Sequence, residues 1–155
     1  MDTSVTIIGI IITLLIGIPL FYMFRAHAAN NAKIKAIFSR FHNYHFSLSD
    51  TQNKKVLGLD EKNKAFIFID FNLTPEEVHF VDLKAVDSVK TIPTTESHSS
   101  NVVKIEFEFQ DKQNQKKQNI PFYTVENDQI GQVYLHEDQQ LSKKWELLLR
   151  NTILS

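Results

Sequence analysis

The sequence indicates an α+β, mainly β protein that one N-terminal helix ties to a membrane. Three observations carry this prediction. Residues 5–24 are an apolar run without an ionisable side chain, and much of residues 44–124 alternates apolar with polar side chains, as half-buried strands do. Helical spacing then returns near the C-terminal end. We therefore expect a transmembrane anchor (1–24), a basic juxtamembrane helix (25–43) and a soluble domain (44–155).

The first element is the apolar run VTIIGIIITLLIGIPLFYMF. As a helix it would extend about 30 Å, which matches the hydrocarbon core of a bilayer. A helix buried in a protein core rarely runs so far without a charge. A cleaved signal peptide is the sharper alternative, because Ala26-His27-Ala28 resembles a cleavage site. Yet no cation precedes the run, and the run is longer than the usual 7–15 residues or so. An uncleaved signal-anchor is therefore the favoured interpretation.

Charge predicts how this helix is oriented. Residues 25–49 hold four cations and no acid, whereas residues 50–155 hold 13 Lys or Arg against 17 Asp or Glu. The positive-inside rule places the basic side in the cytoplasm, so we expect the N-terminus outside and the domain inside, at the inner (plasma) membrane. An acidic domain also lacks the basic face that a nucleic-acid-binding domain needs.

Small residues recur every four positions in the anchor, at Gly9, Thr13 and Gly17. Such a face lets two helix backbones approach closely in lipid, and we name these residues as candidates for helix packing in a homodimer. Gly and Thr are also simply common in membrane helices, and this second explanation stays open.

The juxtamembrane segment is predicted to be an amphipathic helix. Its apolar residues follow the i, i+3, i+4, i+7 spacing of one helix face: Ile34, Ile37, Phe38 and Phe41. The cations Lys33, Lys35 and Arg40 occupy other positions. The helix could lie on anionic headgroups, or its apolar stripe could pack on the domain. We favour a connector helix with weak lipid contact.

From Tyr44 the period is two, which predicts six or seven antiparallel strands. A first strand is expected over 44–49, two hairpins over 56–71 and 102–123, and two strands near 78–81 and 86–92. Each hairpin turn carries an Asp followed three residues later by an Asn: Asp60 with Asn63, and Asp111 with Asn114. The Asp side chain can bond the turn backbone, and Asn tolerates the left-handed conformation that a short loop requires.

Helical spacing returns in HEDQQLSKKWELLLRNTIL. It predicts an amphipathic helix over about 138–152, whose apolar face is formed by Leu141, Trp145, Leu148, Leu149 and Ile153. The acids Glu137 and Asp138 open this helix, and Arg150 lies in its last turn, as the helix dipole favours.

The strings LGLDEKNKAFIF, IPFY and KKWELLL, in this order of elements, resemble bacterial pleckstrin-homology-like domains of small single-pass membrane proteins. The resemblance covers residues 45–153. It implies a strongly bent antiparallel sheet of about seven strands, plugged at one end by the C-terminal helix. Domains of this family that bind phosphoinositides carry clustered cations in the first strand–loop–strand. Here that loop offers Lys54 and Lys55, beside Asp50.

Recognisable catalytic motifs are absent from the sequence. Without cysteine there is no thiol nucleophile, disulfide or thiolate metal site, and no glycine-rich phosphate loop occurs. His42 and His45 alone make a poor ligand set, because zinc sites need three or four ligands. We predict no catalytic residue, no cofactor and no metal.

Two functions are expected from this sequence. The first is a non-enzymatic domain that binds a protein partner at the inner membrane through an open sheet edge or its acidic surface, with strand addition along the edge as the expected mode. The second is a lipid sensor that reads anionic headgroups through six cations: Arg25, Lys33, Lys35, Arg40, Lys54 and Lys55.

Overall fold

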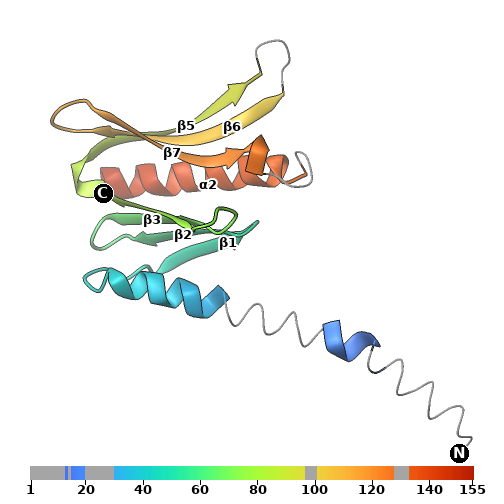
Figure 1. The fold of residues 1–155 in the computed structure, drawn as a ribbon. Coiled ribbons are helices and arrows are strands. Elements are labelled where there is room, and N and C mark those ends of the chain that lie inside the picture. Colours follow the sequence, from blue (N-terminus) through green and yellow to red (C-terminus); the bar gives the residue numbers. More distant parts are fainter. Residues whose placement is uncertain (1–12, 14, 20–29, 97–100, 128–132) are drawn as a thin grey trace, which may run out of the picture. The chain divides into compact units, whose positions relative to one another are not determined.

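The computed structural model describes residues 13, 15–19, 30–96, 101–127 and 133–155 (Figure 1). The chain divides into two compact units, residues 1–42 and residues 43–155, and each is described by itself.

The first unit is helical in its described part. Residues 15–19 are helical, and Leu15, Ile16 and Ile18 are exposed there. Most of the predicted anchor, residues 5–24, lies outside the described residues. Among the described residues, no helix is long and apolar enough to cross a bilayer.

A second helix of this unit spans residues 30–40, where an amphipathic helix was expected. Ile37 is buried, whereas the cations Lys33, Lys35 and Arg40 are exposed. The predicted separation into an apolar and a charged face is therefore confirmed for this helix.

In its described residues, the second unit contains seven strands and a C-terminal helix. The strands are β1 (Leu48–Gln52), β2 (Lys55–Asp60), β3 (Ala65–Asp70), β4 (Glu77–Asp82), β5 (Val86–Thr95), β6 (Val102–Asp111) and β7 (Lys117–Thr124). Two 3-10 turns, η1 (Leu83–Ala85) and η2 (Val125–Asn127), precede β5 and follow β7, and helix α2 spans Leu135–Leu154. The α+β class, the strand number and the C-terminal helix are as predicted.

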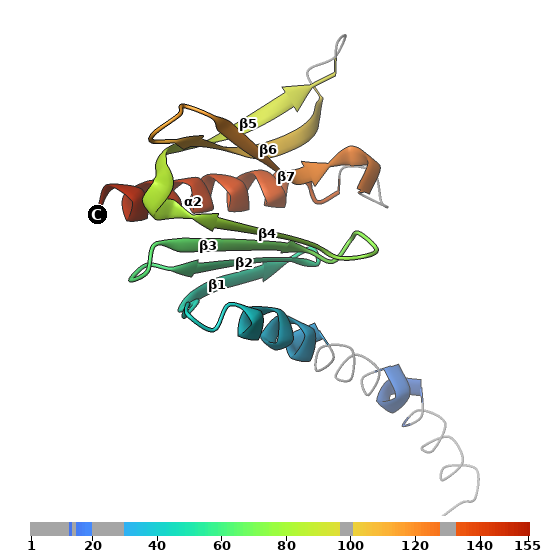
Figure 2. The same ribbon diagram turned by 60° about the vertical axis from the view of Figure 1, so that its left-hand side comes forward.

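The strands form two antiparallel sheets, in the orders β1-β2-β3-β4 and β5-β6-β7. Helix α2 runs between them in both views (Figures 1 and 2). The prediction of one strongly bent sheet is therefore wrong. The strands separate because α2 packs against the three-stranded sheet, chiefly β5, and the apolar side chains of both sheets converge on it.

The chain changes sheet at η1. Asp82 caps this turn by accepting a hydrogen bond from the Lys84 backbone N–H at 3.0 Å. Leu83, which is buried, donates its N–H to the Lys64 carbonyl in the β2–β3 turn at 2.8 Å. The Ala85 carbonyl accepts from the Lys112 N–H in the β6–β7 turn at 2.9 Å. The crossover is thus fixed to one hairpin turn of each sheet.

One core joins both sheets to α2. Its largest fully buried side chains include Trp145 of α2, Phe66 and Phe68 of β3, and Phe107 and Phe109 of β6. The Phe66 ring lies 5.8 Å from Trp145 and 6.0 Å from Phe107, between centroids. Trp145 of α2 therefore lies among aromatic residues of both sheets.

The four-stranded sheet is also buried on its second face. Val56, Ile67 and Ile69 are fully buried but do not belong to the main core. Phe80, paired opposite Ile67, lies on this face, and its ring centroid is 5.0 Å from that of Tyr44. Segment 43–47, which precedes β1, therefore helps to cover the second face.

The first predicted strand is displaced along the chain. A strand was expected over 44–49, whereas β1 begins at Leu48. Tyr44 and Phe46 are half-buried and His45 is exposed, as the alternation predicts, but Leu48, the third apolar residue of the pattern, is 38% exposed. The His45 N–H donates to the Asp60 carboxylate at 2.6 Å instead of joining a strand ladder.

The hairpin turns use the predicted Asp residues. Asp60 accepts from the Asn63 N–H at 2.9 Å and its side-chain amide at 2.7 Å, and Asp111 accepts from the Asn114 N–H at 3.1 Å. At Asp60 desolvation is the largest single effect and raises the pKa, but the hydrogen bonds together outweigh it and the pKa is lowered. At Asp111 the hydrogen bonds dominate, and they lower the pKa against a small effect of desolvation.

The left-handed residue of each turn is one position later than predicted. It is Lys64, at φ 53°, and Gln115, at φ 57°. A third hairpin, β1–β2, has both loop residues left-handed, with Asn53 at φ 50° and Lys54 at φ 59°. Two successive left-handed residues match the twist of the flanking strands.

Removal of the Leu149 side chain tests the core around α2. Leu149 is 0% exposed, so Leu149→Ala should lower the free energy of unfolding by about 2–5 kcal/mol. Urea unfolding of the full chain in detergent, followed by fluorescence of the single tryptophan, measures it. Leu147 on the same helix is 58% exposed, and Leu147→Ala should change the value by no more than about 0.5 kcal/mol. Equal effects would contradict this packing.

Candidate functional site

A cavity of about 490 Å³ lies where the two sheets meet the N-terminal end of α2. We call it the end cavity. It is lined by residues of the β1–β2 turn, β2, β3, the β3–β4 connection, β4, β6, β7, η2 and α2 with its N-cap residue. These residues are Asn53, Lys54, Lys55, Asp70, Asn72, Leu73, Glu77, Lys104, Pro121, Phe122, Tyr123, Thr124, Glu126, Tyr134 and Asp138.

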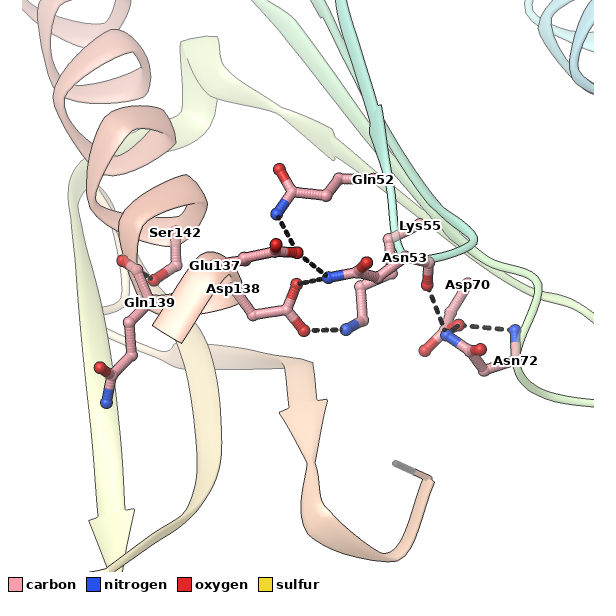
Figure 3. A network of polar contacts seen from close by, with 9 residues as sticks. All are labelled: Gln52, Asn53, Lys55, Asp70, Asn72, Glu137, Asp138, Gln139 and Ser142. Atoms are coloured by element: carbon pink, nitrogen blue, oxygen red, sulfur yellow. Dashed lines mark hydrogen bonds and ion pairs between the residues drawn. The ribbon is translucent and has the colours of Figure 1, made fainter. Parts of the chain in front are cut away.

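A buried ion pair forms part of the cavity wall (Figure 3). The Lys55 ammonium, at the start of β2, contacts the Asp138 carboxylate in the first turn of α2. The side chains are 7% and 0% exposed, respectively. Two charges are removed from water here, and each is stabilised by the other. The pair ties the β1–β2 hairpin to α2.

Polar side chains of the β1–β2 turn extend this connection (Figure 3). The Asn53 amide donates to the other Asp138 oxygen at 3.1 Å and lies 3.4 Å from Glu137. Gln52 lies 3.4 Å from the same Glu137 oxygen. Asn53 is also one of the two left-handed residues of this turn, so the residue that shapes the turn is the one that contacts α2.

A second brace holds the β3–β4 connection against the same turn (Figure 3). Asp70 accepts from the Asn72 N–H at 2.8 Å and from its amide at 2.9 Å. The Asn72 amide also donates to the Asn53 carbonyl at 3.0 Å, and the Phe71 N–H donates to the Lys54 carbonyl at 2.9 Å. The β1–β2 turn, the β3–β4 connection and the first turn of α2 are thus fixed to one another at one end of the cavity.

Aromatic residues of β7 form another wall. The Lys55 ammonium lies 5.3 Å from the Phe122 ring centroid and 5.5 Å from that of Tyr123. Both distances are within the range of a cation–π interaction. The Phe122 ring in turn lies 5.5 Å from Phe68 in the core. This wall therefore packs on the core through Phe122, and its rings contact the Lys55 ammonium.

Asp50 of β1 holds α2 at a second point. Its carboxylate accepts from the Lys144 ammonium at 2.7 Å and from the Trp145 indole N–H at 2.8 Å. The hydrogen bond from Lys144 lowers the pKa of this carboxyl most, and the Trp145 bond assists, against a smaller opposing effect of burial. Asp50 thereby satisfies the polar atom of the buried indole.

The predicted headgroup residues have different environments. Lys55 is buried in its ion pair, and Lys54 is exposed at the cavity. Lys33, Lys35 and Arg40 are exposed on the helix at 30–40, and Arg25 lies outside the described residues. Of the predicted helix-packing residues, Gly9 also lies outside them. Thr13 and Gly17 are exposed, and a Cβ at Gly17 would meet no atom within 4 Å.

Sequence reasoning missed the central member of the site, Asp138. The acid was assigned to the helix dipole, yet its position carried a further signal. Asp138 stands three and seven residues before Leu141 and Trp145, so it lies on the apolar face of α2. A carboxylate on such a face needs a buried partner. The partner's identity, Lys55, depends on tertiary structure.

The polar groups of the end cavity are held in place by contacts within the domain. Preorganised groups of this kind bind a guest with little further ordering. Among the described residues, no group of three or more His, Asp or Glu is placed to hold a metal ion.

Breaking the buried pair should be costly. Lys55→Met leaves the fully buried Asp138 without its cation, and the free energy of unfolding should fall by about 3–5 kcal/mol. The double variant Lys55→Met/Asp138→Leu removes both charges and should recover much of this loss, as measured by urea unfolding. If the double variant is as unstable as the sum of its single variants, the two charges are not coupled.

Acid should weaken the Asp50 contacts. Because the folded-state pKa of Asp50 lies below its ordinary value of 3.8, its contribution is present above that value and is lost as the pH falls through the lower one. Asp50→Asn lacks this titration. Between about pH 5 and pH 2, the variant should therefore lose less free energy of unfolding than the wild type. Parallel losses in the two proteins would contradict the assignment.

Comparison with known proteins returned no match: no family model, no curated protein and no solved structure matches this chain. The pleckstrin-homology-like assignment therefore stays a prediction from residue patterns and element order.

Proposed function

We propose that this chain is a single-pass, membrane-anchored, non-enzymatic protein whose C-terminal domain binds a protein partner in the end cavity. One observation carries the proposal, namely a cavity of about 490 Å³ with apolar walls and fixed polar groups. Its volume is within the range of about 300–1,000 Å³ that is usual for small-molecule sites, so it is large enough to accept side chains of a partner. The apolar run at 5–24 and the cations after it support an anchor with the domain on the cytoplasmic side of the inner membrane.

Element order supports a pleckstrin-homology-like fold for the domain. Seven strands followed by a C-terminal helix are the element order that the sequence resemblance implies, although the strands form two sheets and not the single bent sheet that it also implies. This support concerns architecture alone, and the function of a domain must be argued from its site.

The strand edges favour the cavity over strand addition at the three-stranded sheet. Its edge strands, β5 and β7, contain Pro93 and Pro121, and proline lacks the N–H that a strand ladder uses. On β5, the Thr91 N–H already donates to the Glu146 carboxylate of α2 at 3.1 Å. We therefore assign the partner to the end cavity. These observations argue against strand addition at the three-stranded sheet only, and they do not concern β1 and β4, the edges of the four-stranded sheet.

A lipid sensor is the second candidate. It is favoured by the exposed cations Lys33, Lys35 and Arg40 on the helix at 30–40, in a segment without acids. Burial of Lys55 against Asp138 weighs against headgroup binding at the β1–β2 loop, since that ammonium is already paired.

Site-specific crosslinking from native membranes tests the leading proposal. A photoreactive amino acid at Leu73, which lines the end cavity, should capture a protein partner of the full chain. The same amino acid at Glu61, in the β2–β3 turn at the other end of these strands, is the matched control and should not. Capture from Glu61 alone, or from neither position, would contradict binding in the end cavity.

The lipid alternative predicts a different result. Residues 25–155 should float with anionic vesicles at low salt and separate from them at high salt, because surface charge attraction is screened. Replacement of Lys33, Lys35 and Arg40 by glutamine should abolish flotation. Vesicle binding that is absent at both salt concentrations excludes the sensor.

A further inference from the structure

The charges around the end cavity do not cancel. Its lining has three ammonium groups, on Lys54, Lys55 and Lys104, and four carboxylates, on Asp70, Glu77, Glu126 and Asp138. Lys55 and Asp138 neutralise each other. Lys104 is 2.8 Å from Glu106, which is not part of the lining. Three carboxylates and one cation, Lys54, therefore remain in the lining without an ion-pair partner among the described Lys and Arg residues or carboxylates.

Two of these three carboxylates, Glu77 and Glu126, are accessible to a guest, whereas Asp70 is only 6% exposed. Asp70 accepts hydrogen bonds from Asn72, which are neutral and leave its negative charge in place. Glu77 contacts His79 at 3.0 Å and keeps 42% of its side chain exposed, while Glu126 is exposed. Within the described part of the chain, no Lys or Arg lies within ion-pair distance of any of the three.

The lining also has apolar surface that suits the stem of a basic side chain. Phe122 and Tyr123 are 1% and 3% exposed, and their ring faces are already occupied by the Lys55 ammonium. Leu73 and Pro121 add apolar surface to the same cavity. The alkyl stem of a long basic side chain packs on such a surface while its charged head reaches polar groups.

From this combination we propose that the end cavity accepts a lysine or arginine side chain from an extended segment of a partner protein. Apolar stem contacts would be made with Leu73 and Pro121, and the charged head would pair with Glu77 and Glu126. This inference rests on the proposed protein-binding function and names the partner chemistry of that site. The same charges oppose an acidic segment.

Peptide selection tests this proposal. The full chain in nanodiscs is used to select from a displayed library of random linear peptides. The selected peptides should share a Lys or Arg, and replacement of that residue by norleucine should weaken binding about tenfold or more, because a charge-assisted contact is lost. Enrichment of acidic peptides, of peptides without a basic residue, or of none at all would overturn the proposal.

Charge variants connect the peptide to the cavity. Glu77→Gln/Glu126→Gln should weaken the selected lysine peptide about tenfold and leave its norleucine form unchanged, since the two changes remove one interaction. Glu61→Gln/Asp87→Asn removes the same net charge from exposed residues outside the cavity lining and should have little effect. Lys54→Gln removes a repulsive charge and should strengthen binding. Equal effects of both double variants, or weaker binding by Lys54→Gln, would overturn the assignment.

The crosslinking result separates this inference from the proposed function. If Leu73 still captures its protein partner in the Glu77→Gln/Glu126→Gln variant as efficiently as in the wild type, the cavity binds a partner without a basic anchor. If Leu73 captures nothing, while basic peptides are selected and respond to the cavity variants, the cavity binds a basic side chain as inferred. The proposed function, binding of a natural protein partner there, is then wrong.

Discussion

Helix α2 has to bury its apolar face against two sheets at the same time, and the position of most other elements follows from this requirement. Trp145 and Leu149 lie fully buried in one core that contains side chains of both sheets. Because α2 lies between the sheets, β4 and β5 cannot form one continuous ladder, and the chain changes sheet through η1. Two polar contacts fix the helix to the four-stranded sheet: the Trp145 indole N–H donates to Asp50 of β1, and Asp138 pairs with Lys55 of β2.

The same requirement creates the end cavity. The first turn of α2 is joined to β2 by the Lys55–Asp138 pair, and both residues line the cavity together with side chains of β7. A buried ion pair is a poor source of stability, because desolvation opposes its attraction. We infer that its role is to set geometry, with Lys55 held both by Asp138 and by the aromatic wall of β7.

Sequence periodicity predicted the local elements well, because burial on one face leaves a direct trace in residue order. The alternation in β6 and the helical spacing of Leu141, Trp145 and Leu149 are examples. The turns at Asp60 and Asp111 were also predictable, since their hydrogen bonds are local. The left-handed residues were misplaced by one position, because Lys64 and Gln115 have no special tolerance for that conformation and are forced into it by the hairpins.

Long-range relations left weaker traces. Separation of the strands into two sheets depends on where α2 docks, and no local pattern encodes this. Pairing of Lys55 with Asp138 joins residues far apart in the sequence, although the position of Asp138 on the apolar face of α2 signalled that a partner was needed. The composition of the end cavity depends on several segments meeting in space, so it could not be assembled from the sequence.

Amide hydrogen exchange of the full chain in nanodiscs, with and without the captured partner, tests binding in the end cavity most directly. Added protection should concentrate in the segments that line the cavity, around residues 53–55, 72–73, 121–124 and 134–138. Protection confined to the helix at 30–40 or to the far hairpin turns, with these segments unchanged, would contradict binding in the end cavity.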